Sequence, residues 1–110
     1  MQKEILLDQV TLCADGSVGI KLFKRVLNDD GSVLFSEPHR TSVDVLVEVN
    51  DQVALVNSHL EQMGFPHVPD SATAMVTKLV KLHRADPAVK ARRELVKSNR
   101  SALAAQVASG

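Results

Sequence analysis

The N-terminal part of the chain alternates apolar and polar residues in the manner of β-strands. Over residues 5–45 most apolar side chains recur at every second position, which leaves one side of each strand apolar. Turns at residues 15–16 and 28–31 interrupt the pattern with hairpin spacing, the first as a two-residue loop and the second as a longer one. These features predict a three-stranded antiparallel meander. The apolar positions are Leu6, Val10, Leu12 and Ala14 in the first strand, Val18, Ile20, Leu22 and Val26 in the second, and Val33 and Phe35 at the start of the third.

Pro38 limits the regular sheet in this prediction. Proline cannot donate to the strand ladder and occurs mainly at strand ends and sheet edges. We therefore expect the third strand to stop, or to become an edge strand, near Glu37. Valines alternate with other residues again over residues 41–49, which predicts either an extension of this strand or a fourth strand. His39 and Arg40 would then stand where a strand leaves the sheet.

The apolar spacing changes at Asn50 from two residues to three and four, which is typical of amphipathic helices. Asn50 is a good N-cap and Gly64 a good stop, so a first helix is expected between them. Residues 70–71 can cap a second helix, and the Asp-Pro pair at residues 86–87 predicts the start of a third. The expected apolar stripes are Val53, Val56, Leu60 and Met63, then Ala72, Met75, Val76, Leu79 and Val80, and finally Val89, Arg92, Leu95, Val96 and Leu103.

The third stripe is weak, and residues 101–110 have high helix propensity but little to bury. We expect these last ten residues to fray unless a partner covers them.

The sequence as a whole predicts an α+β fold in one domain, residues 1–110. An antiparallel β-meander of three or four strands occupies residues 1–49, and two or three α-helices occupy residues 50–110. A chain of this length supports one core, and with three Phe and no Trp or Tyr that core must be aliphatic.

The two parts of the chain carry opposite charges. Residues 1–69 hold five Lys and Arg against ten Asp and Glu, a net charge of −5, whereas residues 70–110 hold eight against three, a net charge of +5. The formal net charge of the whole chain is zero, while duplex-binding proteins are usually basic. The asymmetry suits a nucleic acid at the basic end, or other proteins and copies of this chain through complementary patches.

The amino-acid composition limits the cellular compartment and the classes of ligand that we expect. A single cysteine, Cys13, cannot form an internal disulfide, so we expect a reducing compartment. No stretch resembles a signal peptide or approaches the roughly 18 apolar residues of a membrane helix, so we expect a soluble protein without membrane contact. The lack of Trp and Tyr disfavours sites that stack single-stranded nucleic acid or sugar rings.

No residue pattern predicts catalysis, a metal site or a cofactor. The histidines and Cys13 lie at none of the short spacings that present two ligands to one zinc ion. Cys13 falls in a predicted strand, where cysteine is usually a small half-buried apolar residue. The chain has no nucleophile elbow and no glycine-rich phosphate loop. We therefore expect no enzymatic activity and no catalytic, metal-binding or cofactor-binding residue. The four histidines are His39, His59, His67 and His83.

Two groups of basic residues are candidate partner contacts. Residues 78–100 are rich in Lys and Arg, which suits either phosphate binding or a solvated or partner-facing pair of helices. Arg40 follows His39, and Arg is over-represented at interfaces because its planar fork binds carboxylates in pairs; the alternative is a salt bridge to the acidic half of the chain. The basic segment begins with Lys78, Lys81 and Arg84. The candidate partner-binding residues are His39, Arg40, Lys90, Arg92, Arg93, Lys97 and Arg100.

The stretch DGSVGIKLFKRVLNDDGSVLFSEPHRTSV, residues 15–43, places strands, a D-G turn and a His-Arg pair before a helical region. Over roughly residues 10–50 this order resembles small proteins from the tail-gene region of tailed bacteriophages. That pattern continues after the His-Arg pair into a proline-glycine-aspartate loop, which residues 41–44 lack, and the basic helical end has no counterpart in it. The resemblance implies a virion-associated or tail-associated role.

The leading hypothesis is a non-enzymatic structural or assembly protein of a phage tail or baseplate. Its partners would be other virion proteins or copies of itself, and its location the virion or the host cytoplasm. The alternative is a small nucleic-acid-binding or regulatory protein that uses residues 78–100. A host-directed phage inhibitor is a third hypothesis, which the residues neither support nor exclude.

Overall fold

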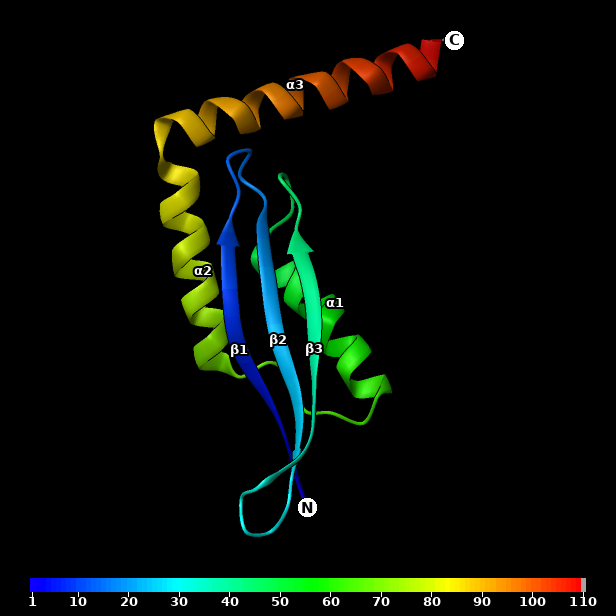
Figure 1. Cartoon of the computed structure of the whole chain (residues 1–110). Coiled ribbons are helices and arrows are strands. Elements are labelled where there is room, and N and C mark those ends of the chain that lie inside the picture. Colours follow the sequence, from blue (N-terminus) through cyan, green and yellow to red (C-terminus); the bar gives the residue numbers. More distant parts are fainter. Residues whose placement is uncertain (110) are drawn as a thin grey trace.

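The computed structural model describes residues 1–109 and contains one antiparallel sheet followed by three helices (Figure 1). The strands are β1 (Gln2–Leu12), β2 (Val18–Leu27) and β3 (Val33–Val43), and the helices are α1 (Val49–Gln62), α2 (Asp70–Ala85) and α3 (Pro87–Ser109). The sheet order is β1-β2-β3, so the predicted α+β fold with an N-terminal meander is confirmed. Residues 44–48 turn the chain into α1, and the described residues contain no fourth strand.

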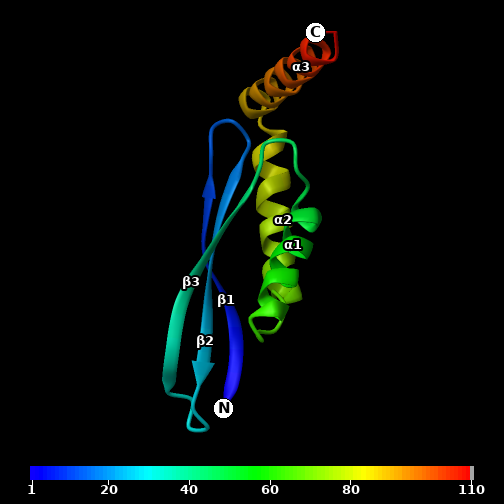
Figure 2. The same cartoon turned by 90° about the vertical axis from the view of Figure 1, so that its right-hand side faces the viewer.

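Helices α1 and α2 cover one face of the sheet and leave the other face open (Figure 2). The alternation of β2 accounts for this arrangement, because Val18, Ile20 and Leu22 are buried beneath the helices while Lys21 and Arg25 stand on the open face. Both sides of β2 were predicted correctly from Val18 to Leu22, but Val26 of the predicted apolar side is not part of the core, and Lys24 on that side is buried instead. The aliphatic core is completed by Ile5, Val43, Val49, Val56, Leu60, Val68, Ala72, Val76 and Val80.

A β-bulge at Asp8 changes which residues of β1 face the core. The pairing of β1 with β2 shifts between Leu7 and Gln9, so Leu7 and Val10 both pack against the core although they are three residues apart. The prediction that Leu6 shares a face with Val10 is therefore wrong, because one inserted residue reverses the alternation of everything before it. Leu12, also predicted as apolar core, is 45% exposed at the end of the strand.

Strand β3 continues through Pro38 to Val43 as an edge strand. Pro38 lies opposite Phe23, and β2 is the one sheet neighbour of β3. The expectation of an edge strand is confirmed, whereas the expectation that the strand stops near Glu37 is wrong. An edge strand tolerates proline because one of its rows of backbone groups has no partner strand.

Helix α1 begins at Val49, slightly before the expected cap at Asn50. Glu48 occupies the N-cap position and makes no side-chain capping bond. The Val49 side chain is buried in the first turn of the helix. Gly64, with φ of +79°, ends α1 as predicted. Met63 is not part of the buried stripe; it is 43% exposed and its sulfur lies 3.5 Å from Lys24 Nζ.

Helix α2 buries a narrow stripe at every fourth residue. Ala72, Val76 and Val80 are buried as predicted, and the stripe continues to the buried Arg84. Met75 was predicted to join this stripe but is exposed, since it lies outside the line formed by Ala72, Val76, Val80 and Arg84.

Helix α3 leaves the body of the molecule at a steep angle to α2 (Figure 1). Asp86 has a non-helical ψ of 128° that separates the helices, and its carboxylate accepts the Ala88 amide at 3.3 Å, as the Asp-Pro signal predicted. Val89 is buried, but Leu95 and Leu103 of the predicted stripe are exposed. The helix continues to Ser109, and fraying of its end in isolation stays a prediction. None of the helices within residues 1–109 has the length and hydropathy needed to cross a membrane.

Candidate functional site

The polar contacts of the molecule concentrate at one end of the sheet. There the β1–β2 loop, residues 13–17, and the β3–α1 loop, residues 44–48, lie beside the end of α2 and the first half of α3 (Figure 1). Four arginines from the two helices bind these loops: Arg84, Arg92, Arg93 and Arg100. We call these four side chains the arginine clasp.

Arg84 joins both loops to α2. It follows the buried Val80 by one helical turn, so its side chain points into the molecule, and the residue is 9% exposed. Its Nε donates to the carbonyl of Gly16 at 3.0 Å, Nη1 to Val47 at 2.8 Å and Nη2 to Asp44 at 2.9 Å. Burial, and next the charge of the neighbouring Arg93, lower the pKa of Arg84 from its usual value, although a guanidinium remains protonated at neutral pH.

The arginines of α3 bind the same two loops. Arg92 Nη1 donates to the Ala14 carbonyl at 3.0 Å, and Arg93 Nε donates to the Val45 carbonyl at 2.8 Å. Arg100 forms a two-pronged pair with the Asp44 carboxylate at 3.1 and 3.4 Å. The hydrogen bonds from Arg100 and from the Val45 amide lower the pKa of Asp44. Ala14 therefore lies in a loop that receives an arginine, and not in the strand as predicted.

The β1–β2 loop is longer than the expected two-residue hairpin. The Asp15 carboxylate accepts both the amide and the hydroxyl of Ser17, which lowers the pKa of Asp15. Gly16 has φ of +94° and lies against Arg93, so that a Cβ placed on Gly16 would be 2.5 Å from Arg93 Cγ. His83 Nε2 lies 2.6 Å from the Cys13 carbonyl and therefore carries the proton in this contact.

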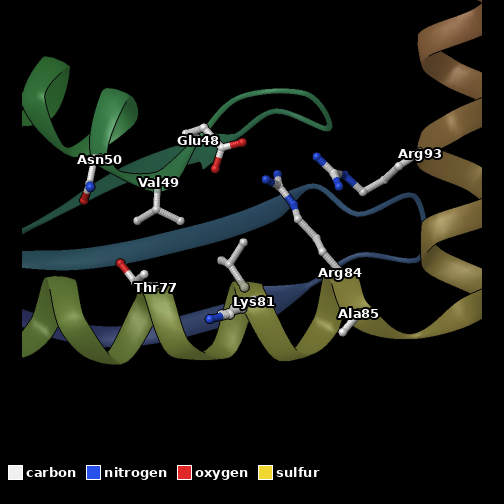
Figure 3. Close-up of a pocket in the computed structure, with 9 residues that line it drawn as sticks. Glu48, Val49, Asn50, Thr77, Lys81, Arg84, Ala85 and Arg93 are labelled. Carbon is white, nitrogen blue, oxygen red and sulfur yellow. The ribbon is translucent and has the colours of Figure 1, made fainter.

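An open cleft of about 390 Å³ adjoins the clasp (Figure 3). Arg84 from α2 and Arg93 from α3 reach the same end of this cleft, close to Glu48 (Figure 3). Neither His39 nor Cys13 lines it. The cleft is bounded by Glu48, Val49, Asn50, Thr77, Val80, Lys81, Arg84, Ala85 and Arg93.

The predicted partner-binding arginines of α3 are largely occupied inside the molecule. Arg92, Arg93 and Arg100 belong to the clasp, whereas Lys90 and Lys97 are exposed and their side chains make no hydrogen bond or ion pair within residues 1–109. Arg84 was treated as part of an outward basic segment, although its place one turn after Val80 in the α2 stripe indicates burial. Nothing in the sequence identifies the carbonyl groups that accept these donors.

His39 and Arg40 lie on opposite faces of β3, inside the strand and not at its exit. His39 is on the helix-covered side, where burial, then the charges of Lys24 and His59, lower its pKa. Arg40 is paired in register with Lys21 and faces the open side. Within residues 1–109 it forms no ion pair, so the alternative of a salt bridge to the acidic half is not observed.

The described residues hold no group of three or more His, Cys, Asp or Glu that could bind a metal ion. The Cys13 thiol lies 3.9 Å from the Thr11 carbonyl and no histidine ring bonds to it in the described chain. The geometry of the site is that of a structural junction made of donors on arginine and of acceptors on the backbone and the Asp44 carboxylate.

We expect Gly16→Ala to destabilise the protein more than Gly31→Ala does. Both glycines have positive φ, +94° and +86°, so each substitution costs about 1–2 kcal/mol of backbone strain. The new methyl group at Gly31 meets nothing within 4 Å, while at Gly16 it collides with the base of the Arg93 side chain, at an added cost of about 1–3 kcal/mol. Urea unfolding of both variants measures the difference. Equal losses of unfolding free energy would contradict the close packing of Arg93 on this loop.

We expect His39 to make the protein less stable in mild acid. Its pKa is lowered in the folded state, so the unfolded chain binds the proton more readily. The free energy of unfolding is therefore unaffected by His39 above its unfolded pKa of about 6.5 and falls as the pH drops from there towards the folded pKa. The urea midpoint should fall between about pH 7.5 and pH 5.5, and it should fall less in His39→Gln. An identical pH dependence in both proteins would show that His39 titrates normally.

Comparison with known proteins adds no family to this picture. The chain matches no protein-family model, no curated protein and no solved structure. The resemblance to tail-region phage proteins therefore stays an expectation from residues 10–50. Inferences about function rest on the clasp, the cleft and the exposed surfaces.

Proposed function

We propose that this protein is a non-enzymatic structural or assembly protein of a phage tail or baseplate and acts through protein contacts. The sequence resemblance supports the assignment to a phage, and the projecting α3 supports a role in protein contacts. Other virion proteins, and copies of the chain itself, are the proposed partners. The proposed location is the virion or the host cytoplasm.

The observation that carries this proposal is an apolar stripe on α3 that extends past the body. Positions along one side of α3 follow alternating steps of four and three residues: Val89, Arg93, Val96, Arg100, Leu103 and Val107. Val89 is buried, and Arg93 and Arg100 bind the loops. Leu103 and Val107 continue the same side but are 62% and 74% exposed. A helix gains most of its stability by burying such a side, which supports a partner that covers it.

A second uncovered apolar surface lies at the opposite end of the molecule. Val33, Leu34 and Phe35 follow the β2–β3 turn and are exposed, next to the acidic Asp29 and Asp30. The turn is far from the C-terminal end of α3 (Figure 1), and the molecule extends over 60 Å in its longest direction. Exposed apolar surfaces at two ends suit a protein that bridges two neighbours in an assembly.

We expect a double variant, Leu103→Ser with Val107→Ser, to lose assembly without losing stability. Both side chains are exposed, so the unfolding free energy should change by less than about 0.5 kcal/mol. Light scattering after gel filtration, at low and high salt and with candidate tail proteins added, measures the complex. Leu82→Ser is the matched control, since Leu82 is 65% exposed but lies on α2.

The proposal requires the double variant to be monomeric where the wild-type chain and Leu82→Ser form a complex. A wild-type chain that stays monomeric with every candidate, at both salt concentrations, contradicts it. Mass spectrometry of purified virions supplies an independent measurement. A fixed copy number per particle supports the structural role, and absence from the particle restricts the proposal to assembly.

Nucleic-acid binding is the second candidate, because four exposed lysines are free of the clasp. The side chains of Lys78, Lys81, Lys90 and Lys97 have no hydrogen-bonding or ionic partner within the described chain. Fluorescence anisotropy with duplex DNA over a salt series tests this function. If it holds, replacing Lys90 and Lys97 by Gln lowers the salt slope by about 2, since each lost phosphate contact removes about 0.9. A wild-type chain without measurable DNA affinity at low salt eliminates it.

A further inference from the structure

Two guanidinium groups beside the cleft lack an ionic partner in the described chain. Arg84 uses three of its five N–H donors and Arg93 uses one, and all four bonds go to backbone carbonyls. The nearby Asp44 carboxylate is bound by Arg100 instead. No carboxylate within residues 1–109 lies within 4.0 Å of either group. Two like charges therefore meet at one end of the cleft, where their hydrogen bonds go to carbonyl groups and the charges of Glu48 and Asp44 act on Arg84 only without direct contact.

The remaining walls of the cleft favour a negative ligand in the same place. The first turn of α1, which contributes Val49 and Asn50, has no side-chain cap, so its amides present the positive end of the helix dipole. Lys81 stands on the α2 side of the rim. Glu48 is the one acidic residue among the lining residues, and its carboxylate forms no ion pair in the described structure. One carboxylate against three cations leaves the cleft positive.

We propose that this cleft binds an oxyanion, a phosphate or a carboxylate group, between Arg84, Arg93 and the first turn of α1. A planar guanidinium binds such groups through paired, charge-assisted hydrogen bonds, and both arginines retain free donors for them. The arginines are already fixed by their carbonyl bonds, which reduces the entropy lost on binding. A cleft of about 390 Å³ has room for the anion and part of the molecule that carries it. The site is independent of the apolar end of α3.

Titration of the ¹⁵N-labelled protein with inorganic phosphate tests the site directly. Chloride is replaced by phosphate at constant ionic strength, so a general salt effect is held constant. We expect saturable shifts of the Val49 and Asn50 amides and of the Arg84 and Arg93 Nε–H signals, with a dissociation constant of about 1 mM. A second arm uses citrate. Tighter binding of phosphate identifies a phosphate ligand, and tighter binding of citrate identifies a carboxylate such as an acidic protein side chain.

Three substitutions separate the site from the overall charge of the protein. Arg93→Gln should weaken phosphate binding by about tenfold or more, since it removes charged donors. Arg40→Gln changes the net charge equally on an exposed strand and should leave binding unchanged. Glu48→Gln removes the one opposing carboxylate and should tighten binding by about threefold or more. Glu48 makes no side-chain capping bond or ion pair, so this variant is expected to fold even if Arg93→Gln does not.

Non-saturable shifts that chloride reproduces would overturn the proposal. So would an Arg40→Gln variant that loses as much affinity as Arg93→Gln, because the effect would then arise from net charge. Unchanged phosphate affinity in Glu48→Gln would place the anion outside this cleft and would contradict the proposal equally. Loss of assembly in the α3 variants has no bearing on these results.

Discussion

The end of the molecule that holds α3 depends on one buried guanidinium. Arg84 hydrogen-bonds carbonyls in both the β1–β2 and the β3–α1 loop, so a single side chain fixes two loops and the end of α2. A buried charge is costly unless its hydrogen bonds are made, and each bond to a charged group contributes about 1.5–3 kcal/mol. Three carbonyls around one planar fork meet that condition for three of the five donors of Arg84. Arg92, Arg93 and Arg100 then bind loops that Arg84 has already positioned.

The fold was predictable where one periodicity dominates a whole element. β2 alternates regularly from Val18 to Leu22 and α2 repeats at every fourth residue, so the faces buried there follow from local geometry, whereas the buried Lys24 does not fit the apolar pattern. The bulge at Asp8 was not predictable. An inserted residue is defined by how its strand pairs with another strand, and the composition of the strand does not indicate it. Pro38 left two possibilities for β3, an end near Glu37 or an edge strand. The pairing with β2 shows that β3 continues as an edge strand. Met63 and Met75 fit the helical period, but both remain exposed and neither belongs to the core.

The candidate site was less predictable than the fold, for a related reason. The sequence identifies the donors of the clasp, because the basic residues of α2 and α3 can be read from it. Apart from the Asp44 carboxylate, the acceptors are backbone carbonyls, which every residue has. The difference between lysine and arginine indicates in part which basic residues bind the loops. All four arginines of residues 70–110 bind the loops, and all four lysines of that segment are exposed. This division follows their chemistry, because a rigid fork suits several carbonyls and a strongly hydrated ammonium suits solvent.

The opposite charges of the two parts of the chain therefore serve the fold itself in part. Part of the positive charge holds α3 against the loops, through carbonyl dipoles and Asp44. Such a docking needs little apolar burial, and Val89 is the one buried apolar side chain of α3 within the described residues. An arm attached through its first half by polar contacts keeps its apolar far end, Leu103 and Val107, for another molecule. The arginines thus hold the first half of α3 against the body, and its far end stays uncovered. The sheet and α2 form the rigid base of this arrangement.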